Sequence, residues 1–248
     1  MTKTLAVIIN HNAKAYTDQL YESLMPYRRD DYDLMVMDNG STLPSEVSRY
    51  TTHKTGKNTY YGGALNIALT HFVGMPEYDS IMVLNNDIIL HGYNFIRTVR
   101  HYAGPLWGID VLSPSVLQPE KSQCTWRQMH GWGVGVPRKV KWVDFMCPFL
   151  TRRVVEEIQQ YDLELIYGWG QDIYTGVICE KLGMSIAVLD TLPVIHMSSQ
   201  TYKDGRSDIS SSEYAAKASA GMYGYFTRMG LLDKLEEFRN YGHTYDHE

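Results

Sequence analysis

Residues 80–87 constrain the fold of this chain more than any other stretch of its sequence. Residues 80–84 form an apolar run of strand length and composition, which ends abruptly in Asn85, Asn86 and Asp87. A buried parallel strand has this pattern where its carboxyl end reaches a ligand site. The Asp87 carboxylate suits Mg²⁺ or Mn²⁺, although an Asx turn that closes the strand would explain the same residues.

Two earlier strands are predicted to end in the same way. Residues 5–9 are continuously apolar and precede Asn10 and Asn12, and residues 34–37 precede Asp38. Helical patterns alternate with these strands, which predicts an α/β fold with a mostly parallel central sheet flanked by helices. We therefore expect the three polar strand ends to meet at one edge of the sheet.

The rest of the chain continues the alternation, with one interruption. Residues 123–145 carry tryptophans among glycines without a helical period, which predicts an antiparallel excursion or flap. A capping-box pattern at residues 210–213 predicts the start of an alanine-rich helix. Apolar spacing predicts further helices near residues 15–25, 65–72, 95–102, 152–161, 172–183 and 231–238, and short apolar runs predict strands near residues 51–54, 111–112, 186–189 and 194–195.

Composition limits the class of protein. The 248 residues are 44% hydrophobic and contain no linker, which predicts one domain with a sizeable core. A formal net charge of −5 without a long basic run argues against a nucleic-acid partner. No apolar run reaches the roughly 20 residues of a transmembrane segment, and no signal peptide is evident, so a cytoplasmic location is expected. The three cysteines form no metal or disulfide pattern and are expected to be buried thiols.

Four blocks of motifs occur in an order and spacing that resemble one known family. The blocks are residues 10–12 with 37–42, residues 58–66, residues 84–87, and residues 142–144 with 152–153, 170–172 and 196. Together they resemble glycosyltransferase family 2 and its rhamnosyltransferase-like relatives, which have the GT-A fold. The resemblance implies a single GT-A-type domain over residues 1–200. Beyond it, the helical patterns predict a C-terminal extension over residues 201–248, packed on the same domain.

The resemblance also implies roles for individual residues. Asp172 would be the catalytic base, and Asp87 with His196 would hold the metal ion. Asp172 also falls in the first turn of a predicted helix, whose dipole we expect to keep it ionised near neutral pH. Nucleotide and donor binding would involve Asn10, Asn12, Asp38, Asn58, Gly62, Gly63, Asn66, Asn85, Asn86 and Asp144. The acceptor side would include Trp169, Gly170 and Gln171.

Three residues depart from the family pattern. Asn85 replaces the first Asp of the Asp-x-Asp metal motif, which leaves Asp87 as the one carboxylate ligand expected there. Gln171 stands where the family has Glu, and Phe145 stands where Gly is usual. The predicted base and the metal-side carboxylate are both retained.

The predicted function is an inverting, metal-dependent transfer of a hexosyl or deoxyhexosyl group. The donor would be a nucleotide diphosphate sugar, the acceptor a hydroxyl group of a glycan or another molecule, and the cofactor Mn²⁺ or Mg²⁺. One alternative is a catalytically silent, carbohydrate-binding relative. Another is a sugar nucleotidyltransferase, although its usual Gly-rich basic loop does not follow the first strand. The C-terminal helices are expected to cover the acceptor side or to form a homodimer contact.

Overall fold

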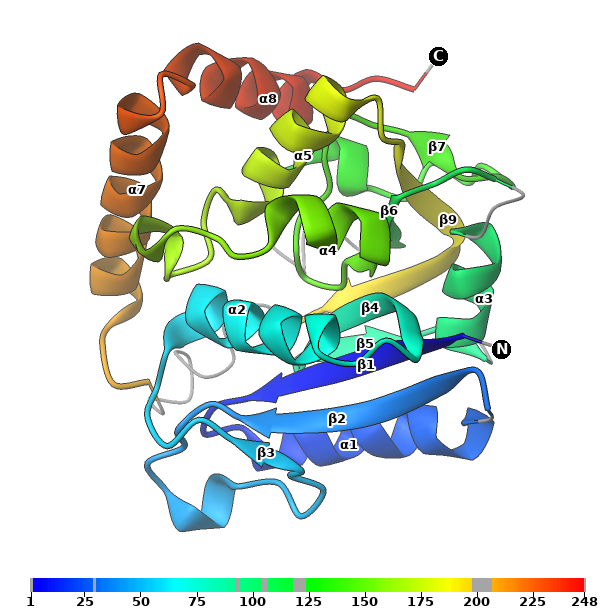
Figure 1. Cartoon of the computed structure of the whole chain (residues 1–248), viewed down its shortest axis with the longest axis vertical. Helices are drawn as coiled ribbons and strands as arrows, with labels where there is room; N and C mark the ends of the chain where they lie inside the picture. The colour runs from blue at the N-terminus through cyan, green and yellow to red at the C-terminus, as the bar shows by residue number, and fades with distance from the viewer. Residues whose placement is uncertain are drawn as a thin grey trace.

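The computed structural model describes residues 2–28, 30–91, 94–103, 107–117, 124–197 and 207–247. These residues form one mixed sheet with helices on both sides (Figure 1). The strands are β1 (Lys3–Asn10), β2 (Tyr32–Asp38), β3 (His53–Lys54), β4 (Tyr78–Asn85), β5 (Ile88–Leu90), β6 (Val111–Val116), β7 (Arg138–Lys139), β8 (Phe149–Thr151) and β9 (Ile186–His196). The predicted division at residues 200/201 lies outside the described residues.

Helices connect and cover these strands. They are α1 (Lys14–Leu24), α2 (Tyr60–Val73), α3 (Phe95–Tyr102), α4 (Arg152–Ile158), α5 (Gln171–Leu182), α7 (Ser211–Arg228) and α8 (Leu232–Thr244). Short 3₁₀ turns are η1 (Met25–Tyr27), η2 (Pro44–Glu46), η3 (Arg127–Met129) and η4 (Leu163–Leu165). In Figure 1, α2 and α4 lie on one side of the strands and α1 lies on the other.

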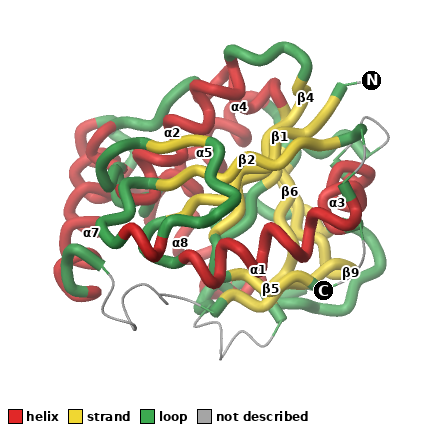
Figure 2. The backbone as a smooth tube through the Cα atoms, turned by 90° about the horizontal axis from the view of Figure 1, so that it is seen from below, coloured by secondary structure: helices red, strands yellow, loops and turns green. Residues whose placement is uncertain are grey.

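The sheet confirms the predicted α/β class. Its order is β3-β2-β1-β4-β8-β6-β9-β5, and β7 pairs with β9. The first four strands in this order run parallel, as do β6 and β9, whereas β8 lies antiparallel between β4 and β6. Figure 2, seen from below, shows α1 crossing in front of the sheet. The parallel strands place their carboxyl ends at one edge, as the sequence predicts.

Several boundaries differ from the sequence prediction. The two strands expected at residues 186–189 and 194–195 are one strand, β9, which pairs with both β6 and β5. The helix expected over residues 152–161 ends at Ile158, because Gln159 adopts a left-handed φ of 56° that stops the helical path. The three-residue strands β5 and β8 are not predicted.

The C-terminal helices bury a second hydrophobic cluster beside the main core. Phe226 of α7 and Phe238 of α8 pack there with Trp142 and Leu165 from the middle of the chain. The Trp142 indole N–H donates to the Phe238 carbonyl at 2.8 Å. The predicted N-cap is borne out at the start of α7, where the Ser210 hydroxyl accepts the Glu213 N–H at 3.1 Å. Both helices therefore pack on the same body as the sheet.

One buried ion pair ties the excursion around β7 to β9. Arg138 Nη2 lies 2.9 Å from Asp190 Oδ1, and the two side chains are 2% and 1% exposed. Asp190 also accepts the backbone N–H groups of Trp132 and Val134. Arg138 donates further to the Tyr245 hydroxyl, which anchors the C-terminal segment. The excursion is thus fixed by charge-assisted hydrogen bonds in a dry environment.

Two smaller expectations have clear outcomes. Cys147 and Cys179 are buried thiols as predicted, whereas Cys124 is partly exposed. Within the described ranges, no helix has both the length and the apolar character that a bilayer crossing needs.

Candidate functional site

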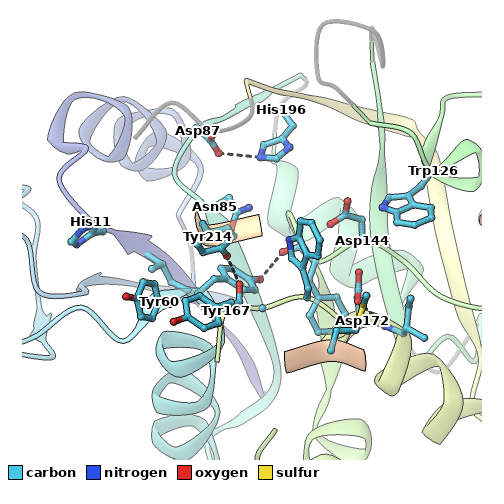
Figure 3. Close-up of a pocket in the computed structure, with 18 of the residues that line it drawn as sticks. His11, Tyr60, Asn85, Asp87, Trp126, Asp144, Tyr167, Asp172, His196 and Tyr214 are labelled. Carbon is cyan, nitrogen blue, oxygen red and sulfur yellow. Dashed lines mark hydrogen bonds and ion pairs between the residues drawn. The ribbon is translucent and has the colours of Figure 1, made fainter. Parts of the chain in front are cut away.

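A pocket of about 580 Å³ opens at the carboxyl edge of the sheet (Figure 3). His11 follows β1, Asn39 follows β2, and residues 85–87 comprise the last residue of β4 and the turn after it. Later parts of the chain close the other side, with His196 from β9 and further side chains from α7 and α8. The pocket thus lies where parallel sheets bind ligands.

Asp87 and His196 form a pair at one end of this pocket. Asp87 Oδ1 lies 3.2 Å from His196 Nε2, as the dashed line in Figure 3 marks. The two residues meet because β5 pairs with β9 in a register that places Ile88 opposite His196. The Met197 N–H also donates to the Asp87 carbonyl at 2.9 Å. Backbone pairing therefore positions both side chains.

The Asp87–His196 pair fits a divalent cation that is shared with a substrate. A carboxylate oxygen is a suitable ligand for Mn²⁺ or Mg²⁺, and substrate phosphates commonly supply much of the coordination shell. His196 offers an imidazole nitrogen beside this carboxylate. Among the described residues, no group of three or more His, Cys, Asp or Glu side chains could hold a metal ion. A cation at this pair would therefore take at most two ligands from these side chains, and a bound diphosphate would have to supply others.

Asp144 and Asp172 form the acidic side of the pocket. Both carboxylates line it, and Figure 3 shows them near Trp126, on the side away from His11. Asp172 stands in the first turn of α5, where its Oδ1 accepts the Ile173 N–H at 2.8 Å. Gly170 caps this helix with a φ of 87°, a left-handed conformation that favours glycine. A Cβ on Gly170 would also lie 2.8 Å from Met222 of α7.

Burial, together with the nearby negative charge of Asp144, raises the pKa of Asp172 to about 8. Burial also raises the pKa of Asp144, against the opposing effect of His196. The expectation that the helix dipole keeps Asp172 ionised at neutral pH is wrong for the free protein. Backbone N–H groups at the start of α5 do lower this pKa, but desolvation of the carboxylate outweighs them.

The side of the pocket away from Asp144 and Asp172 is lined by polar groups that follow β1 and β2 or precede α2. The Asn58 side-chain amide lies 3.3 Å from His11 Nε2 and donates to Asp208 at 3.0 Å. His11 Nδ1 lies 3.1 Å from the Asn39 carbonyl. The sequence predicts Asn58 but not His11 or Asn39. His11 lies between Asn10 and Asn12, and Asn39 follows Asp38. Both therefore belong to the polar strand ends that the sequence indicates.

Three predicted ligands lie outside the pocket lining. Asn10, Asn12 and Asp38 are buried, and their side chains organise the loops after β1 and β2. Asp38 Oδ1 accepts hydrogen bonds from Asn10 at 3.1 Å and from Ser41 at 2.6 Å. The Asn12 carboxamide oxygen accepts the Thr42 N–H at 2.9 Å. These residues support the pocket wall and do not face the cavity, because their polar atoms are used inside the protein.

The predicted donor-binding residues Gly62, Gly63 and Asn66 have structural roles instead. A Cβ on Gly62 would lie 2.3 Å from the Leu165 carbonyl oxygen, so this glycine lets α2 approach η4. A Cβ on Gly63 would lie 2.7 Å from the Thr59 side chain. Asn66 exchanges two hydrogen bonds with the backbone of Tyr161, at 2.9 and 2.8 Å. None of these three residues lines the pocket.

Of the three predicted acceptor residues, two line the pocket and one is buried outside its lining. Trp169 is 42% exposed and lines the pocket together with Gly170. Gln171 is buried outside the lining, and its side-chain amide has no hydrogen-bond partner within the described structure. Four tyrosines that the sequence does not predict as site residues also line the cavity, together with Trp126 of the tryptophan-rich excursion. They are Tyr60, Tyr61, Tyr167 and Tyr214.

Comparison with known proteins identifies the fold. No protein-family model matches the chain, and no curated protein matches its sequence. Solved structures do match in shape. A mannosyltransferase from Pyrobaculum calidifontis, in complex with GDP-Man and Mn²⁺, is 13% identical with a TM-score of 0.56, over 99% of this chain and 76% of that one.

Two further structures of glycosyltransferases share this architecture. GalNAc-T7 with UDP, GalNAc and Mn²⁺ is 11% identical with a TM-score of 0.63, over 97% of this chain and 54% of that one. Glucosyl-3-phosphoglycerate synthase from Mycobacterium tuberculosis, with Mn²⁺, UDP and glucosyl-3-phosphoglycerate, is 14% identical with a TM-score of 0.58, over 93% and 81% of the two chains. The chain therefore has the GT-A glycosyltransferase fold.

Proposed function

We propose that this protein transfers a hexosyl or deoxyhexosyl group from a nucleotide diphosphate donor to a hydroxyl acceptor, with inversion at the anomeric carbon. One observation carries the proposal. A single pocket joins the Asp87–His196 pair, which suits a divalent cation, to Asp172, a carboxylate whose pKa is raised into the working range of a base. The matching structures support it, because their descriptions name nucleotides or nucleotide sugars with Mn²⁺.

Each end of the pocket has a role in this reaction. His11, Asn39 and Asn58 would contact the nucleotide, and Asp38 would hold their loops in place. Asp87 and His196 would hold Mn²⁺ or Mg²⁺, which when bound neutralises the charge of the leaving diphosphate. Asp172 would accept the proton of the acceptor hydroxyl as its oxygen attacks the anomeric carbon.

Release of nucleoside diphosphate tests the proposal directly. The purified protein is incubated with UDP- and GDP-sugars and Mn²⁺, with and without a panel of hydroxyl acceptors, and the nucleoside diphosphate released is quantified. We expect release that depends on the donor. A carbohydrate-binding protein without activity would bind the nucleotide sugar and release none, and a nucleotidyltransferase would instead release pyrophosphate from a nucleoside triphosphate.

Chelation is expected to abolish transfer. Excess EDTA removes the cation that would share the diphosphate with Asp87, and Asp87→Ala removes the one carboxylate of the pair, so both should reduce the rate to background. Activity is measured as nucleoside diphosphate release, with Mn²⁺ added back to the EDTA-treated enzyme. Full activity in EDTA would show that Asp87 does not serve a metal.

The rate is expected to increase with pH through about 8. A base must be deprotonated to act, and kcat/KM reports the pKa of the free enzyme, which burial and Asp144 raise to about 8 for Asp172. The measurement is kcat/KM between pH 6 and 9.5 at constant ionic strength. A profile that is flat across this range would rule out Asp172 as the titrating base.

A further inference from the structure

Two side chains of α8 reach the pocket and contact the same indole ring. Arg239 and His243 are four residues apart, so they project from one face of the helix. The His243 and Trp126 ring centroids are 4.4 Å apart, and Arg239 Cζ lies 5.9 Å from the Trp126 ring centroid. The hydrogen bond from Trp142 to the Phe238 carbonyl fixes the neighbouring backbone. This wall of the pocket is therefore both aromatic and basic.

Arg239 differs from the other cations of the C-terminal helices. Lys234 pairs with Glu180 at 2.6 Å, and Arg228 pairs with Asp162 at 2.7 Å. No carboxylate in the described part of the chain forms an ion pair with Arg239, which is the one pocket-lining side chain with a permanent positive charge. A guanidinium carries five N–H donors in a planar fork that matches a carboxylate or phosphate group. Its donors are thus available to a ligand.

Arg239 belongs to the side of the pocket that carries Asp172. Helices α5 and α8 pack closely, since a Cβ on Gly176 of α5 would lie 2.7 Å from the Phe238 ring. Arg239 follows Phe238 directly, and Asp172 lies one turn before Gly176. The Asp87–His196 pair, by contrast, stands on strand ends. An anion bound by Arg239 would therefore lie on the acceptor side, apart from the donor diphosphate.

We infer that the acceptor carries an oxyanion, a carboxylate or a phosphate group, which Arg239 binds while the acceptor hydroxyl lies at Asp172. Trp126, which also lines the pocket, offers apolar contact for the sugar or polyol body of the acceptor. His243 adds a second nitrogen donor on the same helix face. The inference rests on the proposed glycosyl transfer and restricts the acceptor to anionic hydroxyl compounds.

Calorimetry on the full-length protein tests the anion site without requiring activity. Inorganic phosphate or acetate is titrated at constant ionic strength in the presence of UDP or GDP with Mn²⁺, so that the diphosphate site is filled. For the oxyanion that binds the wild type more tightly, we expect Arg239→Gln to weaken affinity about tenfold or more, as loss of a charge-assisted hydrogen bond does. Arg239→Lys should restore part of it, and the two anions distinguish a phosphate site from a carboxylate site.

Lys234→Gln is the matched control, because it removes the same charge from α8 outside the pocket. It should bind the anion like the wild type. A wild type that binds neither anion, or an Arg239→Gln variant that binds as well as Lys234→Gln, would overturn the inference. Thermal unfolding of each variant checks that it is folded.

A transfer assay separates this inference from the proposed function. With glucose, glucose 6-phosphate and glucuronic acid as acceptors, Arg239→Gln should raise KM for a charged acceptor and leave kcat nearly unchanged. Absence of nucleotide binding and of donor turnover would refute the glycosyltransferase proposal, whereas the calorimetric comparison would still decide whether Arg239 binds an oxyanion.

Discussion

Replacing Asp172 with asparagine should lower kcat for sugar transfer by roughly 10²–10⁴, the range that general-base catalysis supplies. The amide keeps the shape of the side chain but cannot accept the proton of the acceptor hydroxyl. Donor binding should be unchanged, because Asp172 is not among the residues that would contact the nucleotide or the cation. Steady-state kinetics and calorimetry with the nucleotide measure the two effects separately.

Stability provides the control for Asp172→Asn. The folded-state pKa of Asp172 is about 8, above its unfolded value of roughly 4, so the native state holds an extra proton between these limits. Stability contributed by this protonated carboxyl is present at low pH and is lost as the pH rises through about 8. The variant should therefore gain Tm relative to the wild type as the pH increases, which excludes misfolding as the cause of lost activity.

The same variant decides between the two acids of the pocket. An inverting transfer needs one base beside the acceptor, whereas a retaining double displacement needs an additional nucleophile behind the sugar. We expect inversion, which proton NMR of the product's anomeric coupling reports when the donor configuration is known. A retained configuration, or normal turnover by Asp172→Asn together with an inactive Asp144→Asn, would identify Asp144 as the reacting carboxylate.

Replacing Asp190 with alanine should lower the free energy of unfolding by about 3–5 kcal/mol. The change leaves the Arg138 guanidinium charged and unpaired in a site where its side chain is 2% exposed, and it also removes the acceptor for two backbone N–H groups. For a chain of this length the loss corresponds to a decrease in Tm of roughly 6–20 °C. Urea unfolding followed by fluorescence measures it.

Lys217→Ala is the comparison for Asp190→Ala. Lys217 forms an exposed ion pair with Glu213 at 2.7 Å one turn apart on α7, and such exposed pairs contribute little to stability. If Asp190→Ala unfolded at the same urea concentration as Lys217→Ala, the buried pair would not hold the excursion to β9.

The sequence predicts the architecture well where one strand is long and apolar. Residues 80–84 are flanked by polar residues, and this pattern correctly gives β4 and the edge of the sheet where the pocket lies. It cannot give β5 or β8, because three-residue strands show no periodicity and exist only through their pairing. It also divides β9 in two, since Asp190, Thr191 and Pro193 interrupt the apolar pattern of a strand that pairing keeps continuous.

The sequence predicts the kind of site more accurately than it predicts which side chains line the pocket. The sequence shows that polar residues end β1 and β2, but not which side chains turn toward the cavity. Asp38 is therefore predicted as a ligand although its oxygens bond to Asn10 and Ser41, while the next residue, Asn39, lines the pocket. The sequence also could not predict the raised pKa of Asp172, because this pKa depends on burial and on Asp144, which is distant along the chain.

The pairing of β5 with β9 has a consequence for a chain that is synthesised from its N-terminus. The residues that would contact the nucleotide, His11, Asn39 and Asn58, all emerge from the ribosome before β5 does. Asp87 meets His196 only after β9 has been made and its long loop has closed, a step whose entropy cost grows with chain separation. The cation affinity that we propose for this pair would therefore arise late in synthesis, and a nascent chain that ends before β9 would lack it.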